Sequence, residues 1–467
     1  MAASSTLLLP GAGRQAPEPA RTSPPAPGRL RALEAVLALA GFVALCVLVL
    51  TKAPRLLEPD DLAYRASILA LSHGQLLLST AQYQALERQL SSTGGIAQWV
   101  HLPDGYWISE KNPGYPFFAV VFQLLGVLRL APLFYGALAC VGLFAGARRW
   151  LGRYGGTFAV LLFCGSGAAI TFAWRATMPT FTDASLIAAG AGALLWTVLA
   201  TDAPGRRRFL AGLAAFLCLE AATFVRYTDL VELVVAVVAV LVLLRSARLR
   251  RRWAMWWMAT VGLFAAGVLG FDALVYGAPL RTGYGAGEIT FSLSAVAPNL
   301  EHMPRLLVES MPMVLPAAAA VVWIAARMAV AGRVGADRLE TFRRRRDSAV
   351  AAALCAGWAG IWGLYLAYTW TVQQVGGDPV HAVRFYLPAL GLVALLGAWL
   401  VVRLPRALSW SGVGGLLVLG VLSFHGMAAA GAVGPGFGPG VPGFGSGGGP
   451  GTGPPVGGPG AGPPGPP

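Results

Sequence analysis

Residues 148–208 read RRWLGRYGGTFAVLLFCGSGAAITFAWRATMPTFTDASLIAAGAGALLWTVLATDAPGRRR. Two apolar runs, 155–173 and 182–200, are joined by a short polar turn that contains Arg175 and Asp183. Each run approaches the ~20 residues that a helix needs to cross the hydrocarbon core of a bilayer. Arginine clusters flank the pair at both ends, and such clusters mark the cytoplasmic ends of membrane helices. The stretch predicts a helical hairpin that crosses a membrane twice, with its polar turn on the outer side.

The composition of the whole chain has the same character. Of its 467 residues, 56% are hydrophobic and 12% are charged, whereas soluble globular domains carry about 25% charged residues. This excludes a water-soluble domain or a string of them. The net charge of +14 would suit a nucleic-acid binder. The arginines cluster in short connectors between apolar runs, however, which favours a membrane protein with no nucleic-acid partner.

Apolar runs of this kind recur along the chain. They predict an all-α, polytopic membrane helix bundle of about eleven transmembrane helices. The predicted spans lie at 31–51, 130–147, 155–173, 182–200, 209–227, 229–244, 254–275, 306–326, 348–370, 385–402 and 408–428.

The connectors between these runs alternate between short, arginine-rich segments and longer segments with aromatic and acidic residues. The positive-inside rule places the basic set in the cytoplasm. We therefore expect a multi-pass protein of the cell membrane, with a cytoplasmic N-terminus and an extracytoplasmic C-terminus. The apolar stretch 114–128 is interpreted as a re-entrant or interfacial hairpin, because a twelfth span would put every later arginine cluster outside.

The two ends of the chain differ from the rest. Residues 1–29 are rich in Pro, Ala and Ser and predict a disordered cytoplasmic tail. Residues 431–467 are nearly all Gly and Pro and predict a second disordered tail. The transmembrane domain is expected over 30–430.

Two extracytoplasmic loops are long enough to build a site: 53–113 and 276–305. The first contains two amphipathic stretches, 62–76 and 81–90, which suit helices that lie on the membrane surface.

The first loop opens with Glu58-Pro59-Asp60-Asp61-Leu62-Ala63-Tyr64. Adjacent carboxylates at a membrane edge repel each other and lose solvation energy. A site that removes a proton or holds a cation has a reason to keep them. The alternative is helix capping, in which acids favour the positive N-terminus of an interfacial helix.

The same loop closes with Asp104-Gly105-Tyr106-Trp107-Ile108-Ser109-Glu110-Lys111-Asn112-Pro113-Gly114-Tyr115-Pro116. An acid beside a lysine, followed by a Pro-Gly-Tyr-Pro turn, offers an anion site on a shaped backbone. The alternative is an aromatic interfacial belt with a surface ion pair.

Charged residues also lie in four further outer segments. For Asp183 the alternative role is capping of the next helix, and for Arg226 it is an ion pair within the turn Arg226–Asp229. Arg384, at the start of a late span, suits a lipid phosphate, or snorkels to the interface. Arg281 follows a Gly-Ala-Pro turn and is a second phosphate candidate, and His302 is a lone histidine whose alternative role is structural.

Several enzyme classes have no support. Walker, G-x-S-x-G, H-E-x-x-H and dinucleotide-binding motifs are absent from the sequence. The five cysteines lie in apolar runs without metal-binding spacing and are interpreted as small buried hydrophobes.

In order and placement, these motifs resemble the multi-span glycosyltransferases of the GT-C class, which include the protein O-mannosyltransferases and the lipid A aminoarabinose transferases. The resemblance covers about residues 55–400. Its four elements are D-[DE]-x-x-Y at Asp60–Tyr64, G-x-Y-x-S-x-K-x-P-G-Y at Gly105–Tyr115, G-x-P-L-x-T-G-Y at Gly277–Tyr284 and R-[YF]-x-x-P at Arg384–Pro388. This chain departs from the family at Asn112, where a proline is usual, and at Asp61, where many members carry Glu.

The resemblance implies a sugar donor linked to polyprenyl phosphate, transferred with inversion to a lipid, glycan or protein acceptor at the outer membrane face. It implies that Asp60, with Asp61 beside it, provides the catalytic base. The donor phosphate would be held by Lys111, Arg384 and Arg281, with Asp183, Tyr64 and Tyr115 in support and Asp183 holding Lys111. By analogy with the aminoarabinose branch, a divalent metal near Glu110, with His302 as partner, is a further expectation.

Two other functions compete with glycosyl transfer. A transporter or lipid flippase is favoured by acids within or near predicted spans, at Glu220, Glu232 and Asp272. It is disfavoured because the chain shows no internal repeat, which transporters usually have. A scaffold without chemistry would scatter Asp60, Lys111, Asp183 and Arg384, whereas an enzyme would gather them around one cavity.

Overall fold

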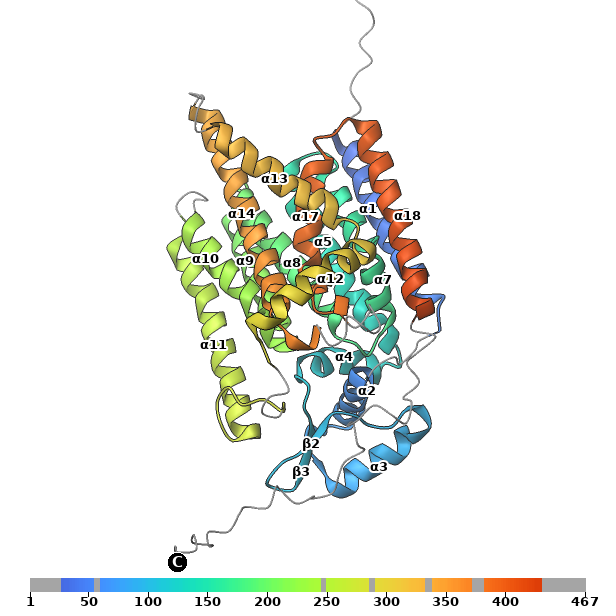
Figure 1. Cartoon of the computed structure of the whole chain (residues 1–467). Coiled ribbons are helices and arrows are strands. Elements are labelled where there is room, and N and C mark those ends of the chain that lie inside the picture. Colours follow the sequence, from blue (N-terminus) through green and yellow to red (C-terminus); the bar gives the residue numbers. More distant parts are fainter. Residues whose placement is uncertain are drawn as a thin grey trace, which may run out of the picture.

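The computed structural model describes residues 27–53, 59–244, 249–284, 290–331, 338–371 and 382–430. These segments form a helical bundle with a small sheet and two short helices at one end (Figure 1). The helices are α1 (Pro27–Leu50), α2 (Pro59–Ser72), α3 (Thr80–Leu90), α4 (Gly114–Leu124), α5 (Ala131–Leu151), α6 (Gly155–Cys164), α7 (Gly167–Trp174), α8 (Thr180–Leu199), α9 (Gly205–Val225), α10 (Leu230–Leu243), α11 (Arg251–Tyr276), α12 (Val296–Ser310), α13 (Val314–Ala331), α14 (Arg338–Leu366), α17 (Leu390–Val401) and α18 (Arg406–Ala430).

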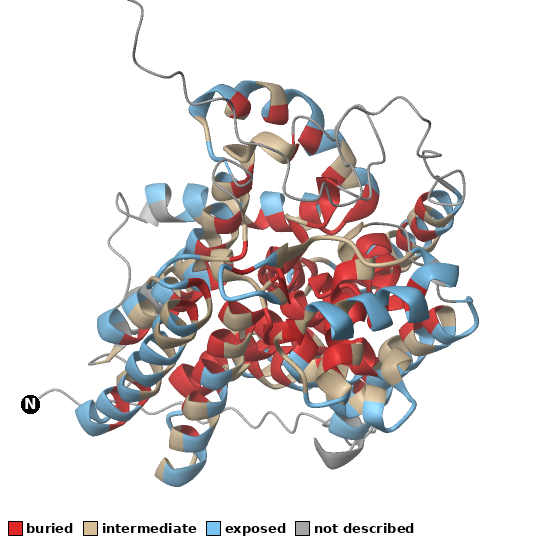
Figure 2. Cartoon of the chain, turned by 90° about the horizontal axis from the view of Figure 1, so that it is seen from below, coloured by how far each residue is buried: buried red, intermediate tan, exposed pale blue. Residues whose placement is uncertain are grey.

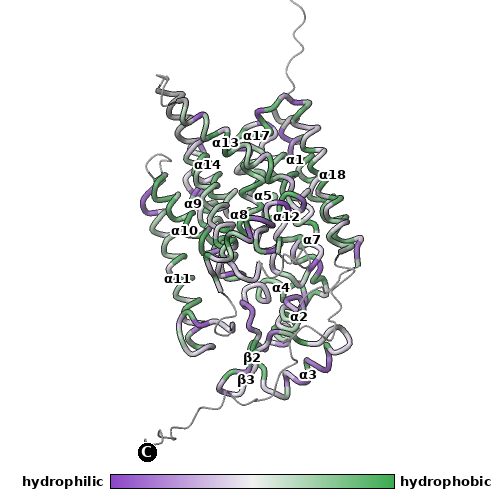
Figure 3. Tube along the Cα trace, viewed as in Figure 1, coloured by the Kyte–Doolittle hydropathy of each residue, from purple (hydrophilic) through white to green (hydrophobic). Residues whose placement is uncertain are grey.

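The predicted all-α membrane bundle is confirmed in its architecture. Within the described residues, seven helices are long and apolar enough to cross a membrane, or up to nine if each of two bent pairs counts as one span. All eleven predicted runs are largely helical, but those at 229–244 and 385–402 form helices of only 14 and 12 residues. The number eleven therefore stays a prediction. Figure 3 shows apolar residues along the outer helices, and hydrophilic ones gathered near α3 and the strands.

Two predicted spans are broken. The run 155–173 forms α6 and α7, which are bent by 59° relative to each other, so the first helix of the predicted hairpin is not a single straight span. The run 306–326 was expected as a single helix after a loop at 276–305, but the chain bends by 111° between α12 and α13. Pro312 lies at the break and disfavours helical geometry in the residue before it. In α12, Met303 and Leu307 are buried whereas His302 and Arg305 are exposed, so α12 is amphipathic and belongs to neither a loop nor a straight span.

The helix α8 lies at the centre of the bundle. In its most apolar window 83% of the residues are buried, compared with 6% in α11 at the periphery. Figure 2 shows buried residues in the middle and exposed ones on the surrounding helices. Small residues let α5 and α8 approach closely: a Cβ added to Gly192 would lie 2.2 Å from the carbonyl carbon of Gly142. Such small-residue contacts are typical of helix packing in membranes.

The first outer loop is more structured than its two predicted amphipathic stretches. These stretches form α2 and α3, and Ser79 and Gln82 form a capping box at the start of α3. One strand between α2 and α3 and two strands between α3 and α4 form an antiparallel three-stranded sheet in the order β1-β3-β2. Its strands are β1 (Leu78–Ser79), β2 (Trp99–His101) and β3 (Tyr106–Ser109).

The ambiguous stretch 114–128 forms α4, an 11-residue helix that ends before α5 begins. At about 1.5 Å per residue, α4 is too short to span a bilayer by itself. The predicted tails are mostly outside the described residues, which begin at 27 and end at 430. Residues 27–29, which the sequence assigned to the first tail, already belong to α1.

Candidate functional site

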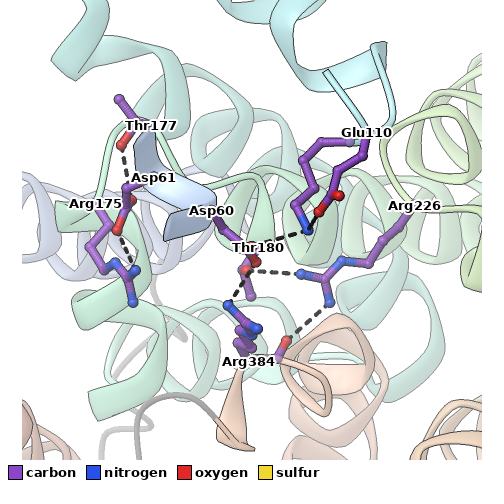
Figure 4. A network of polar contacts seen from close by, with 9 residues as sticks. Asp60, Asp61, Glu110, Arg175, Thr177, Thr180, Arg226 and Arg384 are labelled. Carbon is purple, nitrogen blue, oxygen red and sulfur yellow. Dashed lines mark hydrogen bonds and ion pairs between the residues drawn. The ribbon is translucent and has the colours of Figure 1, made fainter. Parts of the chain in front are cut away.

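Asp60, the second residue of α2, lies between two cations from distant parts of the chain (Figure 4). Its Oδ1 is 3.2 Å from Nζ of Lys111, and its Oδ2 is 2.8 Å from Nη1 of Arg384. The Asp60 side chain is 17% exposed, and Lys111 is 8% exposed. The three predicted residues therefore form one partly open cluster at the end of the bundle that carries the first loop.

Burial and ion pairing oppose each other at Asp60. Burial alone would raise the pKa of this carboxyl, but the charges of Lys111 and Arg384 outweigh it and hold the pKa well below its usual range. At Lys111, burial would lower the pKa, but Asp60, Tyr284 and Glu110 together raise it well above its usual value. Both groups are consequently ionised at neutral pH.

The position of Lys111 is set by β3 and by the second outer loop. The backbone N–H of Lys111 donates to Oγ of Ser109, and its Nζ is 3.1 Å from Glu110. A Cβ added to Gly283 would lie 2.6 Å from Cα of Glu110, so only glycine permits this approach. The approach brings the ring of Tyr284 to 4.8 Å from Nζ of Lys111, a distance suited to a cation–π contact.

Asn112, the departure from the family motif, has a structural role. Its side-chain amide donates to the carbonyl oxygen of Val225, at the C-terminal end of α9. Two residues further along the chain, a Cβ on Gly114 would lie 2.3 Å from the carbonyl oxygen of Phe224. The lysine segment is thus packed directly against α9.

Arg384 is held by its surroundings as well as by Asp60. Its guanidinium lies 4.7 Å from the ring of Phe385. Its carbonyl oxygen accepts a hydrogen bond from Arg226, and the next turn is fixed by Trp362, which donates to the carbonyl oxygen of Tyr386. These contacts place the cation at the mouth of the bundle.

Asp183 does not hold Lys111, as the family resemblance implied. Its Oδ2 lies 3.5 Å from Nε of Arg226, and both side chains are mostly buried. Arg226 also donates to Oγ1 of Thr180 at 3.0 Å (Figure 4). Burial would lower the pKa of Arg226, but Tyr365, Asp183 and Asp229 raise it, so the attraction predicted within the turn Arg226–Asp229 exists beside the contact across to α8.

Asp60 and Asp61 have different environments although they are neighbours in sequence. Asp61 forms an ion pair with Arg175, and neither side chain is exposed to solvent. Thr177 donates a second hydrogen bond to Asp61, at 2.9 Å. The expectation that both acids act directly on substrate is therefore not met for Asp61, which is enclosed and ties α2 to the turn before α8.

The two predicted tyrosines line the inner side of the cluster. The rings of Tyr64 and Tyr115 meet edge to face, with centroids 5.9 Å apart. Burial raises the pKa of Tyr64 above its usual value, and Tyr284, Asp60 and Lys111 are among the groups that act on it. The hydroxyl of Tyr115 donates to the carbonyl oxygen of Ala176 and so anchors α4 to the turn before α8.

Arg281 and His302 lie apart from this arrangement. Arg281 is exposed, and no ion pair of its side chain is seen among the described residues. His302 is exposed on α12, where its Nδ1 is 3.0 Å from the carbonyl oxygen of Pro298. In the part of the chain that the structure describes, no three His, Cys, Asp or Glu side chains are grouped to hold a metal.

Sequence reasoning missed the roles of Arg226 and Tyr284 in the cluster. Both residues were part of motifs singled out above, but only their tertiary contacts bring them near Lys111 and Arg384. For Arg226 the available signal was a charged residue at the outer end of a span, and such a residue fits an interfacial role equally well.

No family model matches the chain, and no curated protein sequence matches it. Among solved structures, the chain is similar to ArnT from Cupriavidus metallidurans in the apo state, with 16% identity and a TM-score of 0.47 over 82% of this chain. It spans about 62% of the length of that protein. It is also similar to the same ArnT bound to undecaprenyl phosphate, at 16% identity, TM-score 0.45 and coverage of 86% of this chain and 72% of that one.

A third similar structure is the oligosaccharyltransferase of Archaeoglobus fulgidus in the apo form, with 12% identity and a TM-score of 0.45. Here the alignment covers 86% of this chain and 55% of the other. Both kinds of protein are glycosyltransferases of the class that the motifs resemble.

Proposed function

We propose that the chain is a glycosyltransferase that moves a sugar from a polyprenyl-phosphate donor to an acceptor hydroxyl at the extracytoplasmic face of the membrane. The observation that carries the proposal is the position of Asp60 between Lys111 and Arg384, at the end of an apolar bundle. Such a transfer needs a carboxylate that can act as a base and cations that stabilise the departing phosphate.

The two cations suit a phosphate leaving group. When the acceptor oxygen attacks the anomeric carbon, the bond between that carbon and the phosphate oxygen breaks, and its electron pair leaves with the phosphate. Lys111 and Arg384 would stabilise the charge that develops there, and their effect is large because the site is mostly buried. Attack from the opposite side inverts the sugar.

Asp60 suits the role of general base. It would take the proton of the acceptor hydroxyl as the new glycosidic bond forms. In the free protein its ion pairs make it a weak base. A phosphate that shares Lys111 and Arg384 would weaken those pairs and raise the proton affinity of Asp60. Donor binding would thereby activate the base.

Asp61 would then be a positioning residue. Its buried ion pair with Arg175 and its hydrogen bond from Thr177 fix the first turn of α2. Because Asp60 belongs to the same turn, this anchor determines where the base points.

The residues around Glu110 do not form a ligand set for the metal expected by analogy. Glu110 already pairs with Lys111, and His302 is exposed on α12. The proposed transfer therefore uses the protein's own cations at the phosphate, and none of its steps is assigned to a metal.

The transporter alternative rests on acids inside apolar helices, and two of the three have partners within the bundle. Glu220 accepts a hydrogen bond from Thr260, and Asp272 accepts one from Tyr227. Glu232 is buried, and its Oε1 has no hydrogen-bond partner among the described residues. Since the partnered acids serve packing, the cluster at Asp60 favours transfer over transport.

The decisive experiment incubates the purified full-length protein, in lipid nanodiscs, with a panel of radiolabelled polyprenyl-phosphate sugars. We expect release of free polyprenyl phosphate together with a labelled acceptor. Movement of intact donor across the bilayer without release would instead identify a flippase. If no donor of the panel is cleaved in the presence of lipid, glycan and peptide acceptors, the proposal is wrong.

A further inference from the structure

A cavity lies inside the bundle, with walls from α8, α9, α10, α14 and α17. Its volume is about 70 Å³, roughly five times the space that one water molecule needs. All of its lining residues except Glu232 are Ala, Val or Leu. Asp60, Lys111 and Arg384 are not among these residues, so the cavity is separate from the proposed active site.

The cavity is open on one side, at the periphery of the bundle. Val235 and Ala239 on α10 and Ala353 on α14 line it and are only half-buried. In Figure 1, α10 and α14 lie near the edge of the bundle. Val238, on the outer surface of α10, is 51% exposed. In a membrane this side faces lipid, so an apolar chain can enter the cavity from the bilayer.

Glu232 is the one ionisable residue of the cavity walls within the described residues. It lies in the first turn of α10 and is 5% exposed. Its Oε1 is buried and has no hydrogen-bond partner in the part of the chain that the structure describes. Gly357 on α14 makes room for the carboxyl, because a Cβ there would lie 2.4 Å from Oε2. A buried acceptor without a partner is costly, and an acid kept in an apolar membrane bundle indicates a functional site.

The chemistry of the walls selects the ligand. A buried water needs several polar partners, whereas these walls offer a single carboxyl. A lipid phosphate is disfavoured because no Lys or Arg lines the described walls, and the carboxyl would repel the anion. An ammonium has several N–H donors, most of which would stay unpaired among Ala, Val and Leu. A hydroxyl has one donor, which matches the one unpartnered acceptor.

We propose that this cavity binds an uncharged lipid alcohol. The hydroxyl donates a hydrogen bond to Oε1 of Glu232, the first carbons of the chain fill the cavity, and the rest of the chain extends into the bilayer. Apolar walls with one polar group that fixes the orientation of the ligand are typical of such sites. The inference goes beyond the proposed glycosyl transfer, because no step of that transfer uses this cavity.

The experiment compares four photoreactive probes on the full-length protein in lipid nanodiscs. The probes share a dodecyl chain with a diazirine group and are an alcohol, an amine, a phosphate ester and an alkane. After irradiation, mass spectrometry locates the crosslinked peptides. We expect the alcohol to label α10 and α14 about 10-fold more than the alkane and the phosphate. Stronger labelling by the amine or the phosphate would overturn the ligand class, and equal labelling by alcohol and alkane would overturn the site.

Two alanines of α14 provide a matched pair of variants. Ala353→Leu fills the cavity, whereas Ala352→Leu adds the same side chain at an exposed neighbour that does not line it. We expect labelling by the alcohol to fall about 10-fold or more in Ala353→Leu and to stay unchanged in Ala352→Leu. Equal labelling in the two variants would overturn the proposal.

A second pair of variants tests the carboxyl itself. Glu232→Leu removes the acceptor, whereas Glu232→Gln keeps an acceptor oxygen at the same position. We expect Glu232→Leu to lose the preference for alcohol over alkane and Glu232→Gln to retain it. Glu232→Leu should remain folded, because it replaces a buried unpaired polar group with an apolar one, and this pair decides the matter if Ala353→Leu does not fold. A preference that persists in Glu232→Leu would contradict the role of Glu232. These readouts do not require sugar transfer, so failure of the proposed function would leave them decisive.

Discussion

Oδ2 of Asp60 lies 2.8 Å from Nη1 of Arg384, although the two residues are 324 positions apart in the chain. Lys111 approaches the other carboxylate oxygen from the end of the first loop. Three segments that the sequence analysis selected separately therefore meet at one carboxylate. A phosphate that enters this cluster must share its cations with Asp60.

Replacement of Asp60 should affect mainly activity, whereas replacement of Asp61 should affect mainly stability. Asp60→Asn should lower sugar transfer at least 100-fold while the protein remains folded, because Asp60 is partly exposed. Asp61→Asn should lower stability by about 3 to 5 kcal/mol, because it leaves Arg175 buried without its partner charge. Release of polyprenyl phosphate and thermal unfolding in detergent measure the two effects. Full activity of Asp60→Asn would refute its role as base.

The cations should control affinity for the lipid phosphate. Lys111→Met and Arg384→Gln should each weaken binding of polyprenyl phosphate by 10-fold or more, since charged hydrogen bonds contribute about 1.5 to 3 kcal/mol. The matched control is Arg88→Gln on α3, whose side chain is exposed. Binding is measured by quenching of tryptophan fluorescence on titration with the lipid. Equal affinities in all three variants would remove the phosphate site from this cluster.

The stability that Asp60 contributes should depend on pH in one direction. Its pKa in the folded protein is below its ordinary value of 3.8, so the ionised form stabilises the fold. The contribution is fully present above about pH 4 to 5, and it is lost as the pH falls through the folded-state pKa. The difference in thermal stability between wild type and Asp60→Asn should therefore stay constant from pH 5 to 8 and change below pH 4. A change between pH 6 and 8 would show that the carboxyl is not held by its two cations.

Close packing of α5 on α8 should make Gly192 intolerant of a side chain. A Cβ there would meet backbone atoms of Gly142 at 2.2 Å, and overpacking of this kind costs roughly 1 to 3 kcal/mol. Gly262→Ala on α11 is the control, because nothing lies within 4 Å of its added Cβ. We expect a lower midpoint of thermal unfolding for Gly192→Ala only. Equal midpoints would mean that the two helices are not in contact in the membrane.

The predicted orientation can be tested with thiol labels that do not cross membranes. The five native cysteines form no disulfide within the described residues, so they can be replaced first. Single cysteines are then placed at Arg207, in an arginine cluster, and at Gln84, on α3. We expect labelling of intact cells at position 84 and protection at position 207. The reverse pattern would invert the topology and place the cluster at Asp60 in the cytoplasm.

Much of the architecture follows from the sequence. An apolar run that enters a membrane must satisfy its backbone hydrogen bonds internally, so it becomes a helix. For this reason the runs at 155–173 and 182–200 were recognisable without a structure. The breaks within 155–173 and at Pro312 were missed, because hydropathy averages over a window and does not detect bends of 59° and 111° between apolar segments.

The candidate site was predictable in its members but only partly in its contacts. The sequence by itself predicted that Asp60, Lys111 and Arg384 lie on one side of the membrane, because the basic connectors alternate with the segments that contain these residues. Only the tertiary structure decided that Asp183 pairs with Arg226, and that Asp60 and Asp61 face different partners. Successive residues of a helix point about 100° apart, so one acid of the pair turns to the open cluster and the other into the packed interior. Which cation each acid meets depends on how segments that are distant in the chain pack together, and no local pattern in the sequence records that.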